Sequence, residues 1–387
     1  MIIAPELATS AAGVPDARPT PAALSRLSAH RRAPLVLVVA AIAAASAAAI
    51  PLVYLVVRSV EAGLPTIIDT LARPRVLEYA AHSLGLAAAT TASALALGTA
   101  VAFVLTRVQV PFARTWLLIS ALPLAVPSYL AGYGWLVALP GLNGFLPSWL
   151  LLTAVTVPYV SLPVAAALRG ASGDLEGVAR TLGRGPLRAF IVATWPSVRP
   201  AAIAGSLLVA LYALSDFGLV AMMRFQTLTW GINAAYSASF DRAQAATLAL
   251  LLVVLALVVV VGERSARRQV PRAAARAVAP RTVGRGALLS FLPIVAAAPL
   301  VGVAIPMLGL LTRLLDAETL RAIDAPRLLG AVGSTIGVAV AAAALAVLLA
   351  LPIAALAARH RGRLVTAIES VGYLGHALPG IVVGLSL

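Results

Sequence analysis

The sequence predicts an all-α integral membrane protein, a polytopic bundle of membrane-spanning helices. Hydrophobic residues make up 61% of the chain and charged residues only 11%, and the mean hydropathy is +0.98. An ordinary soluble domain carries roughly a quarter of its residues as charged side chains. Long apolar segments also recur along the whole chain, separated by short polar stretches. Composition and spacing therefore agree on a membrane bundle.

Nine segments are apolar and long enough to cross a bilayer. A helix of about 20 apolar residues spans the roughly 30 Å hydrocarbon core. The segments are 34–57, 83–106, 115–138, 148–168, 201–223, 244–262, 287–312, 331–358 and 365–387. We therefore expect about nine transmembrane helices.

The polar segments between these helices differ in their arginine content. With the N-terminus in the cytoplasm, the inner segments hold 21 of the 29 arginines. Inner loops of membrane proteins are enriched in Arg and Lys, so the distribution predicts a cytoplasmic N-terminus. It also accounts for the net charge of +15 without a nucleic-acid partner. Residues 1–32, rich in Pro and Ala, are predicted to form a disordered cytoplasmic tail.

A polar island at 170–200 is set between two of the apolar segments. Asp174 is a suitable N-cap for a short helix, and Glu176 would lie near the positive end of that helix. Gly183 is expected to end it. The apolar residues of this helix follow a helical spacing, and they are Leu175, Val178, Ala179 and Leu182. One face of the helix is therefore apolar.

A second short helix is expected to complete the island. Pro186 is suited to its first turn, where a missing N–H costs nothing. Trp195 lies near its end, and Pro196 and Pro200 are expected to stop it because proline interrupts helical hydrogen bonding. The island is thus predicted to be a helical hairpin presented in water.

The spacing within this hairpin resembles the coupling loop of binding-protein-dependent ABC importer permeases. That loop has the pattern Glu-Ala-Ala, three residues, Gly, nine residues, Ile, any residue, Leu, Pro. Gly183 and Pro196 stand at the two main spacings, with Val178 and Ala179 at the Ala-Ala positions before the Gly. Trp195 stands in place of the Leu and Ala193 in place of the Ile. Gly177 occupies the position of the Glu, the acid being one residue earlier at Glu176.

The resemblance implies a set of partners and a location. The loop would dock on an ABC ATPase subunit dimer, and a periplasmic substrate-binding protein would deliver the substrate to a permease in the bacterial inner membrane. ATP would be hydrolysed on the partner, so this chain would be no enzyme and would hold no cofactor. The chain contains no Lys, which a phosphate-binding loop requires. An ordinary helical hairpin at 170–200 is the alternative.

The second part of the chain repeats the first at a period of about 250 residues. Ser83 and Ser334 each begin a similar apolar stretch, and these stretches end at Arg107 and Arg359. The predicted organisation is a tail at 1–32, a six-helix half at 33–262, an Arg-rich linker at 263–286 and an incomplete second half at 287–387. Because the second half lacks its own coupling loop, we expect the sequence to be part of a longer two-half permease.

Fused two-half permeases resemble the ferric-iron class of importer. The stretch from Leu214 to Gly218, and the residues that follow it as far as Tyr236, are similar to the segment after the coupling loop in that class. Related permeases for thiamine and small anions share the pattern. Ferric iron is the expected substrate, and thiamine or another small solute is the alternative. An ion-coupled secondary transporter is the alternative from another class, and it would require several intramembrane acids.

Three residues are candidates for the translocation path. Asp216 is the one acid within an apolar segment of the first half, and intramembrane carboxylates are commonly functional. Its alternative role is structural, close to the outer interface. Tyr129 and Tyr133 lie in a segment rich in Pro, Gly and aromatic residues, which would line a cavity or belong to an interfacial aromatic belt. No metal site is predicted, because the chain has no Cys and its four His lie far apart.

Overall fold

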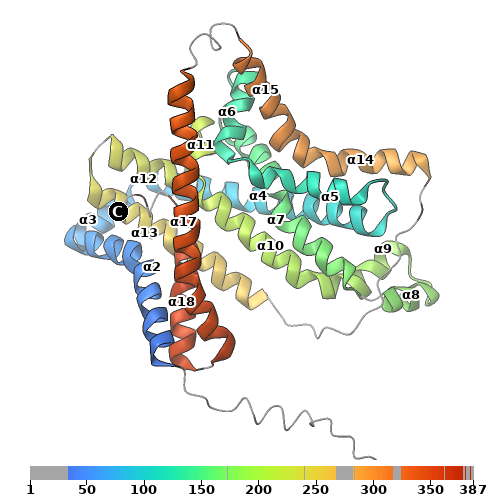
Figure 1. Cartoon of the computed structure of the whole chain (residues 1–387), viewed down its shortest axis with the longest axis horizontal. Coiled ribbons are helices and arrows are strands. Elements are labelled where there is room, and N and C mark those ends of the chain that lie inside the picture. Colours follow the sequence, from blue (N-terminus) through green and yellow to red (C-terminus); the bar gives the residue numbers. More distant parts are fainter. Residues whose placement is uncertain are drawn as a thin grey trace, which may run out of the picture.

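The computed structural model describes residues 34–171, 173–238, 240–266, 284–316, 324–360 and 362–377, together with residues 282, 380 and 384. The regular secondary structure within these ranges is helical, as predicted (Figure 1). The tail at 1–32 and most of the linker at 263–286 lie outside the described residues.

The helices up to residue 266 are α2 (Leu35–Glu61), α3 (Leu64–Ala72), α4 (Pro74–Arg107), α5 (Ala113–Ala121), η1 (Leu122–Ala125), α6 (Ser128–Ala138), α7 (Phe145–Arg169), α8 (Gly173–Thr181), α9 (Pro186–Ala189), η2 (Phe190–Thr194), α10 (Trp195–Ser215), α11 (Gly218–Met222), α12 (Leu228–Ser237) and α13 (Arg242–Ala266). The later helices are α14 (Arg285–Pro299), η3 (Leu300–Ala304), α15 (Ile305–Leu314), α17 (Ala325–Arg359) and α18 (Arg363–Ala377).

Three long helices, α4, α7 and α10, pack against one another (Figure 1). Their close approach depends on glycine. A Cβ atom at Gly205 of α10 would lie 2.8 Å from the Cα of Val160 in α7, and one at Gly98 of α4 would lie 2.8 Å from the Cβ of the same residue. The two glycines therefore allow α4 and α10 to approach the backbone of α7 closely on two sides. Close approach at small residues is typical of membrane helices.

The helix that leaves the 170–200 island continues through both prolines, so the predicted stop at Pro196 and Pro200 is wrong. Residues Phe190–Thr194 form a π turn, and the helix runs on to Ser215. A proline ring clashes with the carbonyl four residues before it in a regular helix, and the wider π turn opens space there. The π turn η3, which is followed by Pro306, repeats this arrangement.

Two of the predicted spans are broken rather than continuous. The predicted helix at 115–138 consists of two pieces bent by 93°, with Pro127 between them. Val126 is extended there, as expected for a residue before proline. The predicted helix at 201–223 ends at Ser215, and a new helix begins at Gly218 after the extended residue Asp216.

The first helix of each predicted half packs against the other half. Helix α2 contacts α17 and α18, whereas α14 and α15 contact α4, α5, α6 and α7 (Figure 1). Helices α4 and α17 are also alike: they have 34 and 35 residues, carry a proline in the first turn and end at an arginine. These similarities favour the repeat, and the domain boundaries themselves stay a prediction.

A glycine crossing joins α6 to α15. A Cβ atom at Gly134 would lie 2.6 Å from the Cα of Pro306, and Gly309 faces the backbone of Gly134 in return. Beside this crossing, the indole N–H of Trp135 donates a hydrogen bond to the carbonyl of Val301 at 2.8 Å. The contact between the two parts of the chain is therefore backbone against backbone at this point.

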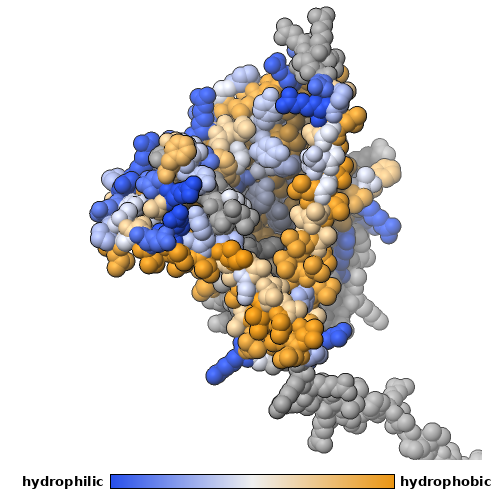
Figure 2. Space-filling model, turned by 60° about the vertical axis from the view of Figure 1, so that its left-hand side comes forward, coloured by the Kyte–Doolittle hydropathy of each residue, from blue (hydrophilic) through white to orange (hydrophobic). Residues whose placement is uncertain are grey.

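The described residues contain seven helices that are long and apolar enough to cross a membrane, or eight if the bent pair counts as one span. The predicted count of nine is not confirmed. Helix α18 has 15 residues, and most of the predicted segment beyond it lies outside the described residues. Apolar side chains cover much of the face in Figure 2, and α17 exposes many of them, including Leu348 and Val338. Such a surface suits a lipid environment.

Candidate functional site

The island at 170–200 forms the predicted hairpin, which projects from the ends of α7 and α10 (Figure 1). Helix α8 ends in a Schellman motif, in which the N–H of Gly183 donates to the carbonyl of Arg180 at 3.0 Å and the N–H of Arg184 donates to the carbonyl of Ala179 at 3.1 Å. Gly183 has φ +78°, a conformation that side chains disfavour. The predicted role of Gly183 as a helix terminator is confirmed.

The ends of the hairpin helices differ slightly from the prediction. Asp174 lies in the first turn of α8 rather than before it, because α8 begins at Gly173. Pro186 is the first residue of α9, as predicted. Trp195 is partly buried against the cluster that contains Val198 of α10, and Pro196 is exposed. Trp195 therefore anchors the second arm to the membrane bundle.

Glu176 is turned toward the second arm of the hairpin. Its carboxylate accepts a hydrogen bond from Arg180 at 3.0 Å and another from the hydroxyl of Thr194 at 3.1 Å. Only 16% of its side chain is exposed. Thr194 belongs to η2, so this carboxylate joins α8 to the helix that continues as α10. Glu176 thereby holds the two arms of the hairpin together.

The apolar face of α8 is open to solvent. Ala179 is buried, whereas Leu182, the residue directly after α8, is 76% exposed. Exposed apolar side chains of the hairpin are Leu175, Val178, Leu182, Ile191 and Val192. A helix at a protein surface normally turns its apolar stripe toward the core. An apolar stripe left exposed on a surface helix is a candidate interaction surface.

Asp216 lies at the break between α10 and α11 and is 8% exposed. Its Oδ1 accepts hydrogen bonds from the N–H groups of Leu219 at 3.0 Å and Val220 at 3.4 Å, so the carboxylate caps α11. Its Oδ2 accepts a hydrogen bond from the hydroxyl of Ser128, the first residue of α6. We name this Ser128 and Asp216 pair the clasp, because it joins the two helix breaks.

The clasp favours the structural alternative for Asp216. We expect Asp216→Ala to destabilise the protein by about 1–3 kcal/mol, because the N–H groups of α11 and the hydroxyl of Ser128 lose a buried partner. Asp216→Asn is the matched control, since its amide oxygen accepts and its amide nitrogen donates to Ser128. The melting temperatures of the two purified variants measure their stability relative to the wild type. Loss of transport in Asp216→Asn with unchanged melting would contradict this role and favour the ion-path prediction, which is otherwise untested.

Tyr129 and Tyr133 lie four residues apart on α6 and therefore on one face of that helix. Both are about half exposed. Tyr129 packs against Gly218, where a Cβ atom would lie 2.7 Å from the Cβ of the tyrosine. Tyr129 thus adjoins the clasp, and the part of both tyrosines in a translocation path stays a prediction.

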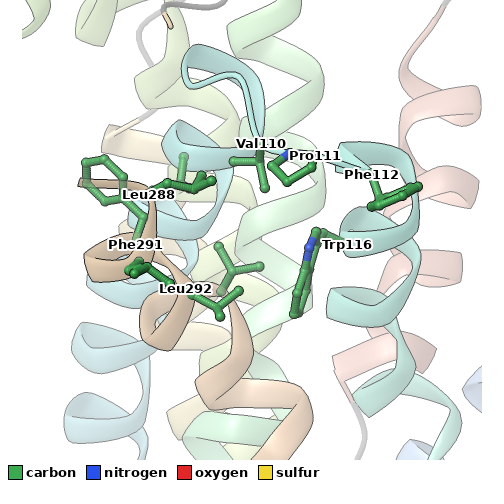
Figure 3. Close-up of a pocket in the computed structure, with 10 residues that line it drawn as sticks. Val110, Pro111, Phe112, Trp116, Leu288, Phe291 and Leu292 are labelled. Atoms are coloured by element: carbon green, nitrogen blue, oxygen red, sulfur yellow. The ribbon is translucent and has the colours of Figure 1, made fainter. Parts of the chain in front are cut away.

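An apolar pocket of about 200 Å³ lies between the turn after α4, helix α5 and helix α14. Figure 3 shows Trp116 on one side of it and Leu288, Phe291 and Leu292 of α14 on the other. Its lining is almost wholly hydrocarbon, so it offers no ligand for an ion. Among the described residues there is also no group of three His, Cys, Asp or Glu side chains that would hold a metal ion.

Sequence reasoning missed the partners of the two acids. Thr194 and Ser128 lie 18 and 88 residues from Glu176 and Asp216. Ser128 follows Pro127 at a helix start, a local signal for a cap but not for a distant carboxylate. Only the packing of α6 against α11 brings the clasp together.

Comparison with known proteins places the chain among transport permeases. It is 29% identical over 345 residues to the Fe(3+)-transport system permease protein FbpB 2 of Haemophilus influenzae, covering 87% of this chain and 68% of that protein. It is 32% identical to the molybdenum transport system permease protein ModB of Mycobacterium tuberculosis, covering 46% of this chain and 74% of ModB. With the putrescine transport system permease protein PotI of Escherichia coli it shares 30% identity, over 39% of this chain and 61% of PotI.

No protein-family model matches the chain. The relatives nevertheless agree in kind, since all three are permease proteins of transport systems. The helical membrane architecture described above agrees with them as well. The chain belongs to the family of ABC importer permeases.

Proposed function

We propose that this chain is the membrane-spanning subunit of an ATP-driven importer and forms a translocation path for ferric iron delivered by a periplasmic binding protein. The relative named for ferric iron aligns over 87% of this chain. The relatives named for molybdenum and putrescine align over 46% and 39%. The extent of the alignment is what favours iron over the other solutes.

The exposed apolar face of α8 is the observation that supports coupling to an ATPase. Leu175, Val178 and Leu182 present an apolar stripe in a segment that also carries Arg180 and Arg184. The arginine distribution favours a cytoplasmic position for this segment. A soluble ATPase subunit is the partner that would cover such a stripe in the cytoplasm. ATP would be bound and hydrolysed on that subunit.

The second arm of the hairpin continues directly into α10, so a displacement of the hairpin would be transmitted to that membrane helix. From Pro186 to Ser215 the chain is helical without interruption, a length of about 45 Å at 1.5 Å per residue. Glu176 ties α8 to this helical segment at Thr194. Asp216 of the clasp directly follows the last residue of the segment, Ser215. Displacement of α8 by the ATPase would therefore shift α10 and bias the clasp between two states.

Uptake of radiolabelled ferric iron tests the proposed substrate. The protein is expressed together with its ATPase and binding protein in cells that lack their own ferric-iron permease. We expect ATP-dependent iron uptake that excess putrescine, molybdate, sulfate or thiamine does not reduce. Uptake of one of those solutes in place of iron would overturn the substrate, and uptake driven by an ion gradient without the ATPase would overturn the transport class.

A further inference from the structure

Arg107 is the last residue of α4, and its charged guanidinium group is buried. Only 7% of the residue is exposed. Within the described part of the chain, Nε, Nη1 and Nη2 are all buried without a hydrogen-bond partner. A guanidinium removed from water is strongly unfavourable unless an anion compensates its charge. Any anion that lies near Arg107 therefore stabilises its charged form.

Glu176 of the hairpin lies close enough to Arg107 for its negative charge to favour the charged form of the guanidinium, without a direct hydrogen bond between the two. A second contact brings the same parts together: the rings of Phe103 in α4 and Phe190 in η2 meet edge to face with centroids 5.3 Å apart. Residues 103 and 107 are four apart and share one face of α4. The cytoplasmic-side end of α4 thus lies along the hairpin.

Two arginines act on the Glu176 carboxylate, Arg180 and Arg107. They differ in how their interaction with Glu176 would respond to a movement of the hairpin. Arg180 lies one turn further along α8 and moves together with Glu176. Arg107 belongs to a different helix. The bond to Arg180 is therefore insensitive to any rigid displacement of the hairpin, whereas the attraction to Arg107 changes directly with it.

We propose that Arg107 is the positioning residue of the coupling hairpin, and that the Glu176 carboxylate bonds Arg107 in place of Arg180 when the hairpin moves. This inference rests on the proposed function of the hairpin. It gives the hairpin a second connection into the membrane, through α4, beside the direct one through α10. The burial of all three guanidinium nitrogens excludes an outside ligand as the partner of Arg107 in the described state.

A double-mutant cycle in thermal melting tests the pairing without any substrate. Glu176→Gln leaves the buried charge of Arg107 without an anion, so we expect it to melt well below the wild type. Adding Arg107→Gln removes the uncompensated charge, so the double variant should melt at least about 3 °C above Glu176→Gln alone. If Arg107→Gln shifts melting equally with and without Glu176→Gln, the pairing is wrong.

Uptake per ATP hydrolysed, measured in vesicles with ferric iron, tests the positioning role. We expect Arg107→Gln to lower this ratio about tenfold, Arg107→Lys to retain most of it, and the charge exchange of Arg107→Glu with Glu176→Arg to restore it in part. Arg75→Gln, at an exposed arginine in the first turn of α4 and therefore at the opposite end of the helix from Arg107, is the matched control and should not change it. An unchanged ratio in Arg107→Gln would overturn the role. Absence of iron uptake by the wild type would overturn the substrate instead, and the melting cycle would still decide the pairing.

Discussion

Gly183→Glu is expected to uncouple ATP hydrolysis from transport while the protein stays folded in the membrane. The backbone of Gly183 is left-handed at φ +78°, and a side chain there costs about 1–2 kcal/mol. A Cβ atom at this position would meet nothing within 4 Å, so the variant creates no clash inside the chain. The substitution therefore distorts the Schellman turn at Gly183 and alters the surface that the tip of the hairpin presents to the proposed ATPase subunit.

The measurement compares uptake and ATP hydrolysis in vesicles, and we expect uptake per ATP to fall about tenfold or more. Gly183→Asn is the matched control, because asparagine tolerates the left-handed conformation and adds no charge. It should retain most of the activity. Normal uptake in Gly183→Glu would rule out the hairpin tip as a coupling element.

Gly134→Leu is expected to prevent α6 from packing against α15, with loss of most of the folded protein. The new Cβ atom would lie 2.6 Å from the Cα of Pro306. Both sides of this contact are backbone, so no side chain can rotate away to make room. Overpacking of this kind typically costs about 1–3 kcal/mol, and more where the backbone must move. Loss of the crossing would also break the hydrogen bond from Trp135 to Val301.

The yield of monodisperse protein after detergent extraction, with its melting temperature, measures this effect. Gly85→Leu is the matched control, since a Cβ atom at Gly85 of α4 would meet nothing within 4 Å. We expect the control to behave as wild type. Equal yield and melting for the two variants would mean that the glycine crossing does not hold these parts together.

The sequence predicts most of the helices because their signals are local. The apolar stretch at 148–168 corresponds to α7, and the one at 244–262 lies within α13. The breaks in the spans were not predicted, because the apolar composition continues through Pro127 and past Asp216. The local signals for the two breaks were Pro127 and the combination of Asp216 with Gly218. Whether such residues break a helix depends on packing between helices that are distant in sequence.

Some features of the hairpin at 170–200 could be predicted from local sequence, and others depend on contacts between its two arms. The end of α8 follows from Gly183 alone, since a left-handed residue after a helix is most often glycine. The direction of Glu176 does not follow from its position, because Arg180 and Thr194 together decide it. The spacing of Leu175, Val178 and Leu182 predicts an apolar face, but only the structure shows that this face lies outward.

Crosslinking from the exposed face of α8 tests the central claim, that this face docks on an ATPase subunit. The sequence contains no cysteine, so Leu182→Cys introduces a single thiol for a photoactivatable reagent. Val258→Cys in α13, at a residue that is 63% exposed, is the matched control. We predict an adduct with the ATP-hydrolysing subunit from Leu182→Cys and none from Val258→Cys. An active transporter that yields no such adduct from Leu182→Cys, or equal adducts from both, would contradict the account.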